Sequence, residues 1–483
     1  MRRSRWIHSL LAASLAAGVC MAGCSTTGTI NGGDDDTSSG HPDADVTHPG
    51  DPDADVTHPG DPDADVNPDD PDADVNPGDP DAEVPGDPDA GPIINPPDGL
   101  GPWTGNDDVP WSQDPPFGLP VSKVPQFVSL GFDDNGYSGL EGTSGTGGFS
   151  WSYTMVQSRH NPHGSGNAGS YDGAPVKFSY YLTTYYISIW NSESPTYVKR
   201  AWHQAMVDGH EMGNHTQTHS HGAAFDVAHW AQEIQDCIDW ITKPFDPNEV
   251  NFSPDNSKGA GIARAQIYGY RTPFLEYNDK TFTVLDQKNF YYDTSIEEGW
   301  QDDIDGRNMP WPFTLNHGSP GNELLVSWQL DPPKEHLNNH PGIWELSPHP
   351  VIVPPDDQCA HYGLSYSLRN KMHALASWFD VASGKVTGLD YNLWVQFKLN
   401  KAEFLAVMKY TLDQRLAGNR APFTFGAHTD IYSSKYTAAP NATDSERQQA
   451  IEEFIDYALS KPQVRFVSNK QILDWVRNPV PLP

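Results

Sequence analysis

The chain has 483 residues and a formal net charge of −34 at pH 7, with 64 acidic side chains against 30 Lys and Arg. It is too long for one minimal domain and long enough to bury a large hydrophobic core. The acidic balance argues against nucleic acid and against docking on anionic lipid through charge, and it favours neutral or cationic polymers as partners.

The first 24 residues are typical of an export signal rather than of a folded element. Arginines precede an apolar run, residues 10–19, which is too short to span a bilayer. The run leads to Met-Ala-Gly-Cys24, which resembles the lipobox of bacterial lipoproteins; Cys20 is a poorer match. We expect cleavage before Cys24 and a lipid on it, with plain secretion as the alternative. The protein would then be exported and lipid-anchored to the cell envelope, with the outer membrane and cell surface as one destination.

Residues 25–99 predict a disordered linker. Residues 31–100 contain 21 acidic residues and no Lys or Arg, and a ten-residue unit that begins at Pro42 recurs from Pro52 and in part from Pro62. Such a segment has too few large apolar side chains to offset the entropy lost on ordering. Proline and charge repulsion would keep it extended, so it would act as a tether for the folded domain, residues 100–483.

Within residues 100–483, apolar periodicity predicts strands that alternate with helices. Strands are expected at residues 126–132, 176–182, 267–270, 423–427 and 464–467. One further strand is expected to end at residue 293. Helices are expected at residues 198–207, 228–241, around 282–285, after the capping box at 443–446, and at 470–476. Residues 300 to about 400 are interpreted as long loops. This alternation indicates a mainly parallel α/β sheet or barrel.

Polar side chains follow several of these strands. Asp133 and Asp134 come directly after the first strand, Arg271 follows the strand 267–270, Asp293 ends another, and His428 follows the strand 423–427. In strand–helix folds, active sites collect at the carboxyl ends of strands. Taken singly, each of these residues also fits a structural role, such as a turn, an ion pair or a core histidine.

His215 and His219 lie four residues apart, a spacing that puts both imidazoles on one face of a helical or tightly wound turn. Two imidazoles do not complete a zinc site, and the aspartates at 133–134 offer the third ligand. Alone, the pair equally fits two surface histidines. Two further alternatives stay open: Trp300 and Trp311 could stack on sugar rings or pack in the core, and Cys237 and Cys359 could form a disulfide or remain buried thiols.

Five motifs in this order resemble the polysaccharide deacetylases with NodB homology, carbohydrate esterase family four. They are Asp133-Asp134, His215-Thr216-x-x-His219, Arg271-x-Pro273-Phe274, Asp293 and His428. Animal-type chitin deacetylases are similar in further segments: Gly209-His210-Glu211, Tyr270–Leu275, Trp311–Leu315 and Asn419–Pro422. The resemblance covers about residues 120–478 and implies a distorted (β/α) barrel of the NodB type.

The resemblance implies a metal site with open positions for water and substrate. Asp134, His215 and His219 would hold Zn²⁺ or another divalent transition metal such as Co²⁺. Thr216 would hydrogen-bond within the histidine loop. Neighbouring residues of a strand point to opposite faces, so the backbone must turn after Phe132 if both aspartates are to share the site.

The resemblance also implies the proton-transfer groups. Asp133 would be the general base, with Arg271 pairing with it, and the backbone N–H of Phe274 would stabilise the oxyanion. His428 would protonate the leaving amine, oriented by Asp293. The sequence departs from the family in three places: Asn135 replaces Gly or Ala, Phe274 replaces Tyr, and Gly426-Ala427 replaces a larger apolar residue before His428, which implies a wider acetate pocket.

We therefore expect a monomeric, metal-dependent hydrolase acting on acetamide bonds. It would remove N-acetyl groups from a β-linked aminoglycan such as chitin, chitooligosaccharide or peptidoglycan. One alternative is an O-acetyl esterase acting on a plant polysaccharide such as xylan. The other is a surface glycan-binding protein without catalytic activity. The membrane would be contacted through the lipid anchor only.

Overall fold

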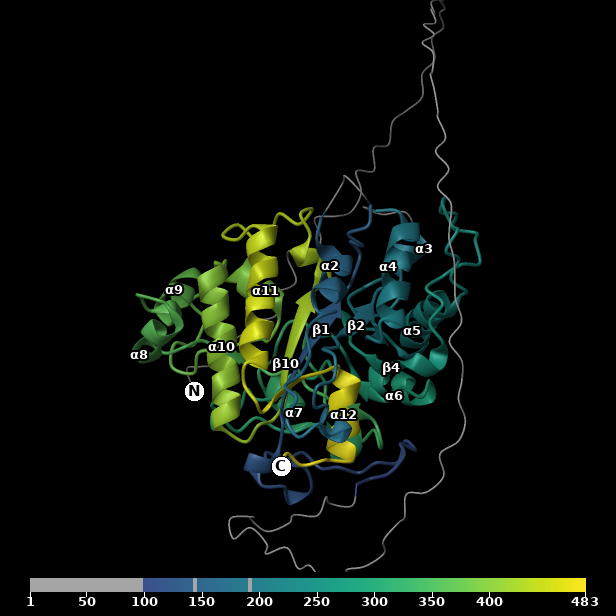
Figure 1. Cartoon of the computed structure of the whole chain (residues 1–483). Coiled ribbons are helices and arrows are strands. Elements are labelled where there is room, and N and C mark those ends of the chain that lie inside the picture. Colours follow the sequence, from purple (N-terminus) through teal and green to yellow (C-terminus); the bar gives the residue numbers. More distant parts are fainter. Residues whose placement is uncertain (1–98, 142–145, 190–192) are drawn as a thin grey trace, which may run out of the picture. The chain divides into compact units, whose positions relative to one another are not determined.

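Helices surround one curled, mostly parallel sheet in the computed structural model, which describes residues 99–141, 146–189 and 193–483 (Figure 1). The expected export signal, the lipidation site Cys24 and nearly all of the expected linker lie outside the described residues. The α/β fold class expected from the sequence is confirmed.

The sheet has nine strands in the order β10-β1-β2-β3-β4-β5-β7-β6, with β11 also paired to β1. Neighbouring strands are parallel except β6 and β7, and a separate antiparallel pair joins β8 and β9. The bounds are β1 Gln126–Asp133, β2 Ser179–Leu182, β3 Glu211–Asn214, β4 Ile267–Tyr270, β5 Tyr292–Asp293, β6 Phe313–Thr314, β7 Trp344–Glu345, β8 Val351–Ile352, β9 Lys385–Val386, β10 Phe423–His428 and β11 Val464–Phe466.

The curl of the sheet is visible in one contact. Arg271, just after β4, donates a hydrogen bond from Nη1 to the carbonyl oxygen of Gly131 in β1, 3.2 Å away. Three strand spacings of about 4.8 Å separate these strands along a flat sheet, which is beyond the reach of one side chain. The sheet must therefore bend around Arg271, as the predicted distorted barrel requires.

The helices expected from apolar periodicity are present, most with slightly different ends. In Figure 1, α10 and α11 lie to the left of β1 and β10, and α4 and α5 lie to the right. The bounds are α2 Gly148–Met155, α3 Tyr185–Ser188, α4 Pro195–Val207, α5 Val227–Thr242, α6 Asp279–Gln287, α7 Pro320–Ser327, α8 Asp356–Cys359, α9 Leu368–Leu375, α10 Lys401–Ala417, α11 Asp444–Leu459 and α12 Asn469–Arg477. The predicted capping box is confirmed, since Thr443 and Glu446 exchange hydrogen bonds at the start of α11.

The interpretation of residues 300–400 as loops is wrong in part. This region contains α7, α8, α9, the strands β6 to β9 and a π-helical turn at Asn392–Gln396. The sequence analysis also missed α10, although it is one of the longest helices described. Its residues Phe404–Met408 are all buried, so α10 shows no single apolar stripe from which a helix could be predicted.

The core answers two questions that the sequence left open. Trp311 is buried in it, whereas Trp300 is half-buried. Cys237 and Cys359 are both buried and unpaired; their thiols lie 3.3 Å and 3.8 Å from the carbonyl oxygens of Leu182 and Pro354.

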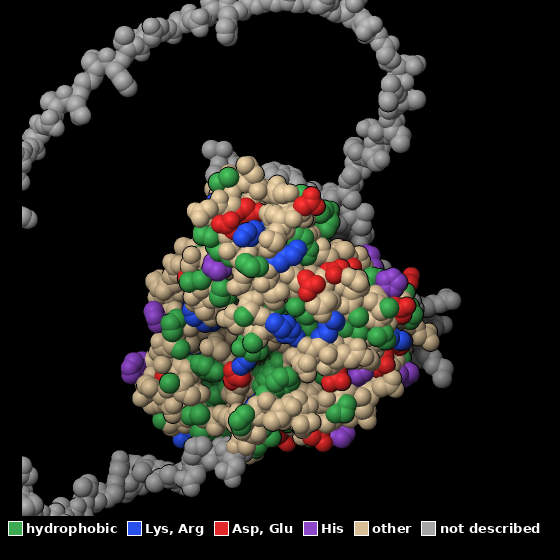
Figure 2. Space-filling view, turned by 90° about the vertical axis from the view of Figure 1, so that its right-hand side faces the viewer, with side chains coloured by type: hydrophobic (Ala, Val, Ile, Leu, Met, Phe, Trp, Pro, Cys, Tyr) green, Lys and Arg blue, Asp and Glu red, His purple; other side chains and the backbone are tan. Residues whose placement is uncertain are grey.

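Among the residues that the structure describes, every helix is too short or too polar to cross a bilayer. The face shown in Figure 2 mixes acidic, basic and hydrophobic side chains.

Candidate active site

The end of β1 turns sharply, as the paired aspartates require. Asp134 and Asn135 have left-handed backbones, with φ of 65° and 70°. Asparagine tolerates this conformation better than most residues, and its side chain fixes the turn. The Asn135 amide donates to the carbonyl oxygens of Phe132 and Tyr181, each at 2.9 Å, while its oxygen accepts from the Thr429 hydroxyl. The departure at Asn135 thus has a structural reason.

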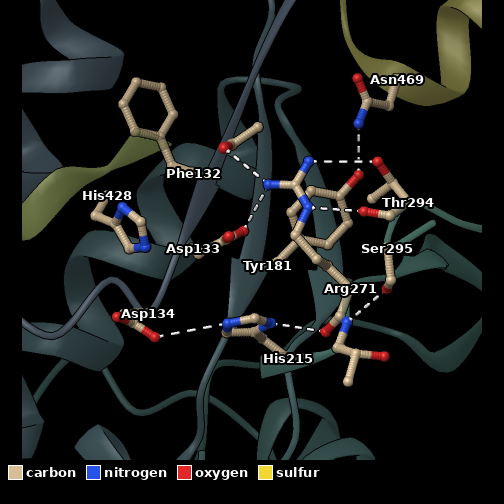
Figure 3. Close-up of polar contacts among 12 residues, drawn as sticks. Phe132, Asp133, Asp134, Tyr181, His215, Arg271, Thr294, Ser295, His428 and Asn469 are labelled. Atoms are coloured by element: carbon tan, nitrogen blue, oxygen red, sulfur yellow. Dashed lines mark hydrogen bonds and ion pairs between the residues drawn. The ribbon is translucent and has the colours of Figure 1, made fainter. Parts of the chain in front are cut away.

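Three ligand atoms, from Asp134, His215 and His219, lie within 4.8 Å of one another. Asp134 Oδ1 is 3.0 Å from His219 Nε2 and 3.6 Å from His215 Nε2. The Nδ1 atom of His215 lies 2.7 Å from the carbonyl oxygen of Arg271, to which it donates, so its Nε2 lone pair faces Asp134 (Figure 3). Burial lowers the pKa of His215 to about 4, which keeps the imidazole neutral.

The donor set fits a divalent transition metal. Asp134 Oδ1 is buried and makes no hydrogen bond with any described residue, although two imidazole nitrogens lie close to it. A buried oxygen without a partner is costly, and a cation between it and the nitrogens would satisfy it. Burial acts to raise the pKa of Asp134, but the neighbouring His219 outweighs it, so the pKa lies well below its usual value. One carboxylate and two imidazoles suit zinc and leave positions open.

Glu233 in α5 anchors the loop between the two histidines. Its carboxylate accepts hydrogen bonds from the backbone N–H groups of Gln217, at 3.1 Å, and Thr218, at 2.9 Å, and from the Thr218 hydroxyl at 2.7 Å. These contacts hold the loop against a helix of the core. The sequence analysis missed Glu233, because only the folded chain brings α5 to this loop.

The histidines themselves follow β3 in a tight loop rather than a helix. Thr216 and His219 have positive φ values of 70° and 56°. The Thr216 hydroxyl accepts a hydrogen bond from the backbone N–H of His219 at 3.2 Å, so the expected role of Thr216 within the loop is confirmed. Left-handed backbone at two of the three cluster residues, Asp134 and His219, and at Thr216 between the histidines is a feature that functional sites often share.

Asp133 and Arg271 form the expected ion pair. Arg271 Nη1 lies 2.8 Å from Asp133 Oδ1, and both side chains are almost fully buried. Arg271 also donates to the backbone oxygen and hydroxyl of Thr294, and its guanidinium lies 4.6 Å from the centre of the Tyr181 ring (Figure 3). The space for it comes from Gly131, where a Cβ atom would lie 3.0 Å from Nη2.

His428 pairs with Asp390, not with Asp293 as the resemblance implied. His428 Nδ1 lies 2.7 Å from Asp390 Oδ1, and the backbone N–H of His428 donates to Oδ2 at 3.0 Å. Burial would lower the pKa of His428, but the Asp390 carboxylate outweighs it and raises the pKa to about 10. The imidazole is therefore charged at neutral pH. Figure 3 shows His428 near Asp133 and Asp134.

The segment that carries Asp390 lies along the free edge of β10. The N–H of Gly426 donates to the carbonyl oxygen of Gly388 at 2.8 Å, and Leu389 pairs with Gly426 as in a parallel sheet. A Cβ atom at Gly426 would lie 2.0 Å from the Leu389 side chain. Gly426 therefore admits the Asp390 segment, and Leu389 fills the space that was expected to widen the acetate pocket. No strand-end signal marked Asp390 in the sequence, since it lies in the region interpreted as loops.

Asp293 instead supports the loop after β4. Its carboxylate accepts from the backbone N–H and the hydroxyl of Ser295, both at 2.8 Å, and the Ser295 oxygen accepts from the backbone N–H of Thr272 at 2.8 Å. Asp293 is fully buried beside Glu345, and burial raises its pKa to about 6. Through Ser295, Asp293 supports the backbone at Thr272, which lies between Arg271 and the turn that contains Phe274.

Phe274 lies beside the metal-ligand cluster. Its ring centre is 4.5 Å from that of His219, edge to face, and 4.1 Å from that of His221, on which it stacks. Both Phe274 and Leu275 have left-handed backbones, with φ of 56° and 54°. The ammonium group of Lys334 donates to the carbonyl oxygen of Leu275 and so supports this turn. The sequence analysis missed Lys334 as well.

Comparison with known proteins gives similarity to one kind of curated protein. No protein-family model matches the chain. Chitin deacetylase 8 of Bombyx mori is 24% identical over 224 residues, which are 46% of this chain and 46% of that protein. Over that stretch, this chain is similar to a chitin deacetylase. It matches only about half the length of the curated relative, so the activity of the whole protein is a proposal.

Solved structures with a similar fold come from the same group. A candidate polysaccharide deacetylase from Mycobacterium smegmatis has a TM-score of 0.40 and 16% identity over 75% of this chain and 93% of that chain. A family 4 carbohydrate esterase from Streptomyces lividans has a TM-score of 0.23 and 15% identity over 35% and 62%. At these values the roles of individual residues rest on the geometry of this chain.

Proposed function

We propose that this protein is a metal-dependent hydrolase that removes N-acetyl groups from a β-linked aminoglycan such as chitin, chitooligosaccharide or peptidoglycan. The proposal rests on one observation: three sets of side chains lie together near the carboxyl ends of the parallel strands. The cluster of Asp134, His215 and His219 lies beside the Asp133–Arg271 pair and the His428–Asp390 pair. These three groups support the proposed roles of a ligand set, a base and an acid.

In the proposed reaction, each of these residues has a separate role. A divalent metal on Asp134 and the two histidines, Zn²⁺ in the first instance, would acidify a water molecule and polarise the acetyl carbonyl. Asp133 takes the proton of the attacking water, and the ion pair with Arg271 holds its carboxylate in place. The backbone N–H of Phe274 stabilises the oxyanion. His428 donates its proton to the leaving nitrogen, and acetate and a free amine result.

The state of His428 favours an amide over an ester substrate. An amine leaves a tetrahedral intermediate only after its nitrogen is protonated, whereas an alkoxide depends less on full proton transfer. An imidazolium whose pKa is raised to about 10 carries that proton throughout the neutral range. Acetate release from chitooligosaccharide and from acetylated xylan separates the two functions: faster release from xylan would favour the O-acetyl esterase.

The experiment that tests the function is acetate release by the full chain, with metal supplied or removed by a chelator. His215→Ala should abolish acetate release and weaken Zn²⁺ binding at least ~100-fold, because it removes a ligand. His361→Ala, an exposed histidine, is the control and should change neither. Acetate release by His215→Ala at the wild-type rate would refute the proposal. Glycan binding by the wild-type protein without acetate release, with Zn²⁺ or Co²⁺ supplied, would favour an inert glycan-binding protein.

The place of action is part of the proposal. The Met-Ala-Gly-Cys24 signal supports export and a lipid on Cys24, and the acidic Pro-rich linker supports a tether between that lipid and the catalytic domain. A surface-held enzyme would meet its polymer outside the cell.

A further inference from the structure

A large cavity lies outside the candidate active site. Its volume is about 1400 Å³, and its walls come from residues 300–307, the end of α7, the α9 region, β9 and α10. None of the metal-ligand or proton-transfer residues lines it. Pockets for small molecules usually measure roughly 300–1,000 Å³, so this cavity has room for a longer ligand.

Three half-buried tryptophans line the cavity: Trp300, Trp328 and Trp378. Trp300 and Trp328 meet edge to face, with ring centres 5.8 Å apart and an interplanar angle of 80°. Trp378 packs against Phe397, with ring centres 5.3 Å apart. Each ring is therefore held in one orientation while part of its surface stays accessible. Rigid, partly exposed aromatic rings are suited to stacking on flat apolar ligand faces.

The polar groups of the cavity favour a neutral ligand. Asp302, Asp305 and Asp380 are exposed carboxylates on its wall. Three basic side chains also line it and are engaged with oxygens of the protein. Lys385 donates to the backbone oxygen of Gln301, Arg369 donates to those of Val353, Val381 and Ala382, and Arg307 donates to the side-chain oxygen of Gln414. Acceptors near indole faces, with the charges largely balanced, suit a sugar ring, which has apolar C–H faces and hydroxyl groups at its edge.

The cavity is joined to the active site through short stretches of chain. Trp300 donates from Nε1 to Glu297 at 3.2 Å, and the same loop begins at Thr294, which contacts Arg271. On the opposite wall, Lys385 starts the segment that ends at Asp390, the partner of His428. The loops that form the cavity therefore also carry partners of the proposed catalytic groups.

We propose that this cavity is an accessory subsite for a further stretch of the same glycan chain, made of neutral acetylated sugar units. This inference rests on the proposed function for the identity of the polymer. A chain held at both places would bind more tightly than a short fragment, because the second contact is intramolecular. The subsite would therefore give the enzyme a preference for long chains.

The test compares long and short oligosaccharides. In the full chain, Trp378→Ala should weaken binding of hexa-N-acetylchitohexaose about tenfold, as loss of a central aromatic contact does, and leave binding of the disaccharide unchanged. Trp240→Ala is the matched control, since Trp240 is also a half-buried tryptophan packed on the main core and does not line the cavity. Calorimetry measures binding in a His215→Ala background, where the sugar is not consumed.

A second variant, at an exposed position, keeps the test valid if Trp378→Ala does not fold. Asp302→Asn changes only an exposed side chain and should weaken hexasaccharide binding about threefold, as loss of one hydrogen bond does. In the catalytically intact protein, Trp378→Ala should raise KM for the hexasaccharide about tenfold and leave kcat and the disaccharide KM unchanged.

Two results would overturn the subsite. One is equal hexasaccharide affinity in Trp378→Ala and Trp240→Ala, and the other is an equal loss for disaccharide and hexasaccharide. Hexasaccharide binding that depends on Trp378, in a wild-type protein that releases no acetate, would support the subsite and refute the proposed function. Acetylated xylohexaose is run in parallel, so that a different neutral polymer would also be detected.

Discussion

At the scale of single residues, the partner of His428 determines the pH range in which His428 can act as the general acid. A histidine paired with a buried carboxylate stays charged well above its ordinary pKa of about 6.5. Asp390 makes two contacts with His428 and is itself fully buried, so its charge acts at short range with little screening by solvent. The pKa of His428 is therefore raised to about 10 mainly by Asp390, and the carboxylates of Asp134 and Asp133 add to this effect.

Substitution of Asp390 should move the alkaline limb of the pH profile. In Asp390→Asn the pKa of His428 falls toward its ordinary value, so the imidazole loses its proton as the pH rises past about 7. We expect acetate release at pH 8.5 to fall about 100-fold, as loss of a general acid does, and to fall less at pH 6. The wild-type alkaline limb should lie near pH 10. Rates measured from pH 5.5 to 10.5 check this.

Asp293→Asn is the control for that profile. Asp293 supports the turn of Thr272 through Ser295, and its carboxylate forms neither a hydrogen bond nor an ion pair with His428. Its substitution should lower activity or stability without moving the alkaline limb. If Asp293→Asn moved the limb and Asp390→Asn did not, the assignment from the resemblance would be right and the pairing described above would have no functional meaning.

At the scale of elements, the site depends on which helices and strands are brought together. Strand β1 supplies Asp133, the turn after it supplies Asp134, and β10 supplies His428, in register with Asp133. Helix α5 holds the histidine loop through Glu233. Contacts made by residues outside the ligand set are known to change metal affinity. We therefore expect α5 to affect metal affinity as much as the histidine loop does.

Glu233→Gln should weaken metal binding without unfolding α5. Glutamine keeps one acceptor but turns an NH₂ group toward the donors of Thr218. We expect Zn²⁺ affinity to fall about 10-fold, within the range for outer contacts of a metal site. Asp236→Asn, on the same helix, is the matched control and should bind Zn²⁺ as the wild type does. Titration with Zn²⁺ and circular dichroism measure affinity and helix content; equal affinity in the two variants would contradict the role of Glu233.

The elements also show what could be predicted from the sequence. Strands β1, β4 and β10 and helices α5 and α11 were predicted because apolar runs and capping residues are local signals. The ligand cluster followed from His215, His219 and the paired aspartates. Asp390 could not be predicted, because a single bridge between Leu389 and Gly426 sets its place. Nothing in local spacing encodes that edge contact, whereas the resemblance points to Asp293, which lies at a strand end.

At the scale of the whole molecule, charge is divided unevenly along the chain. Residues 31–100 hold 21 acidic residues without a Lys or Arg, about one third of the 64 in the chain. The acidic balance that argues against nucleic acid as a partner thus lies in good part in residues 31–100. If this segment is the proposed linker, its uniform charge would favour an extended chain. The enzyme and its anchor are expected to be separable functions.

Cys24→Ala should therefore release the protein from the membrane and leave its chemistry unchanged. A single acyl signal is weak, but the two or three chains of a lipoprotein cysteine hold firmly. In cells, the wild type should incorporate labelled palmitate and sediment with membranes, and Cys24→Ala should do neither. Its kcat on a soluble chitooligosaccharide should equal that of the wild type. Cys20→Ala, at the poorer site, is the control and should remain in the membrane fraction. If Cys24→Ala stayed with the membrane and Cys20→Ala left it, the lipid would lie on Cys20 and the expected boundary would shift accordingly.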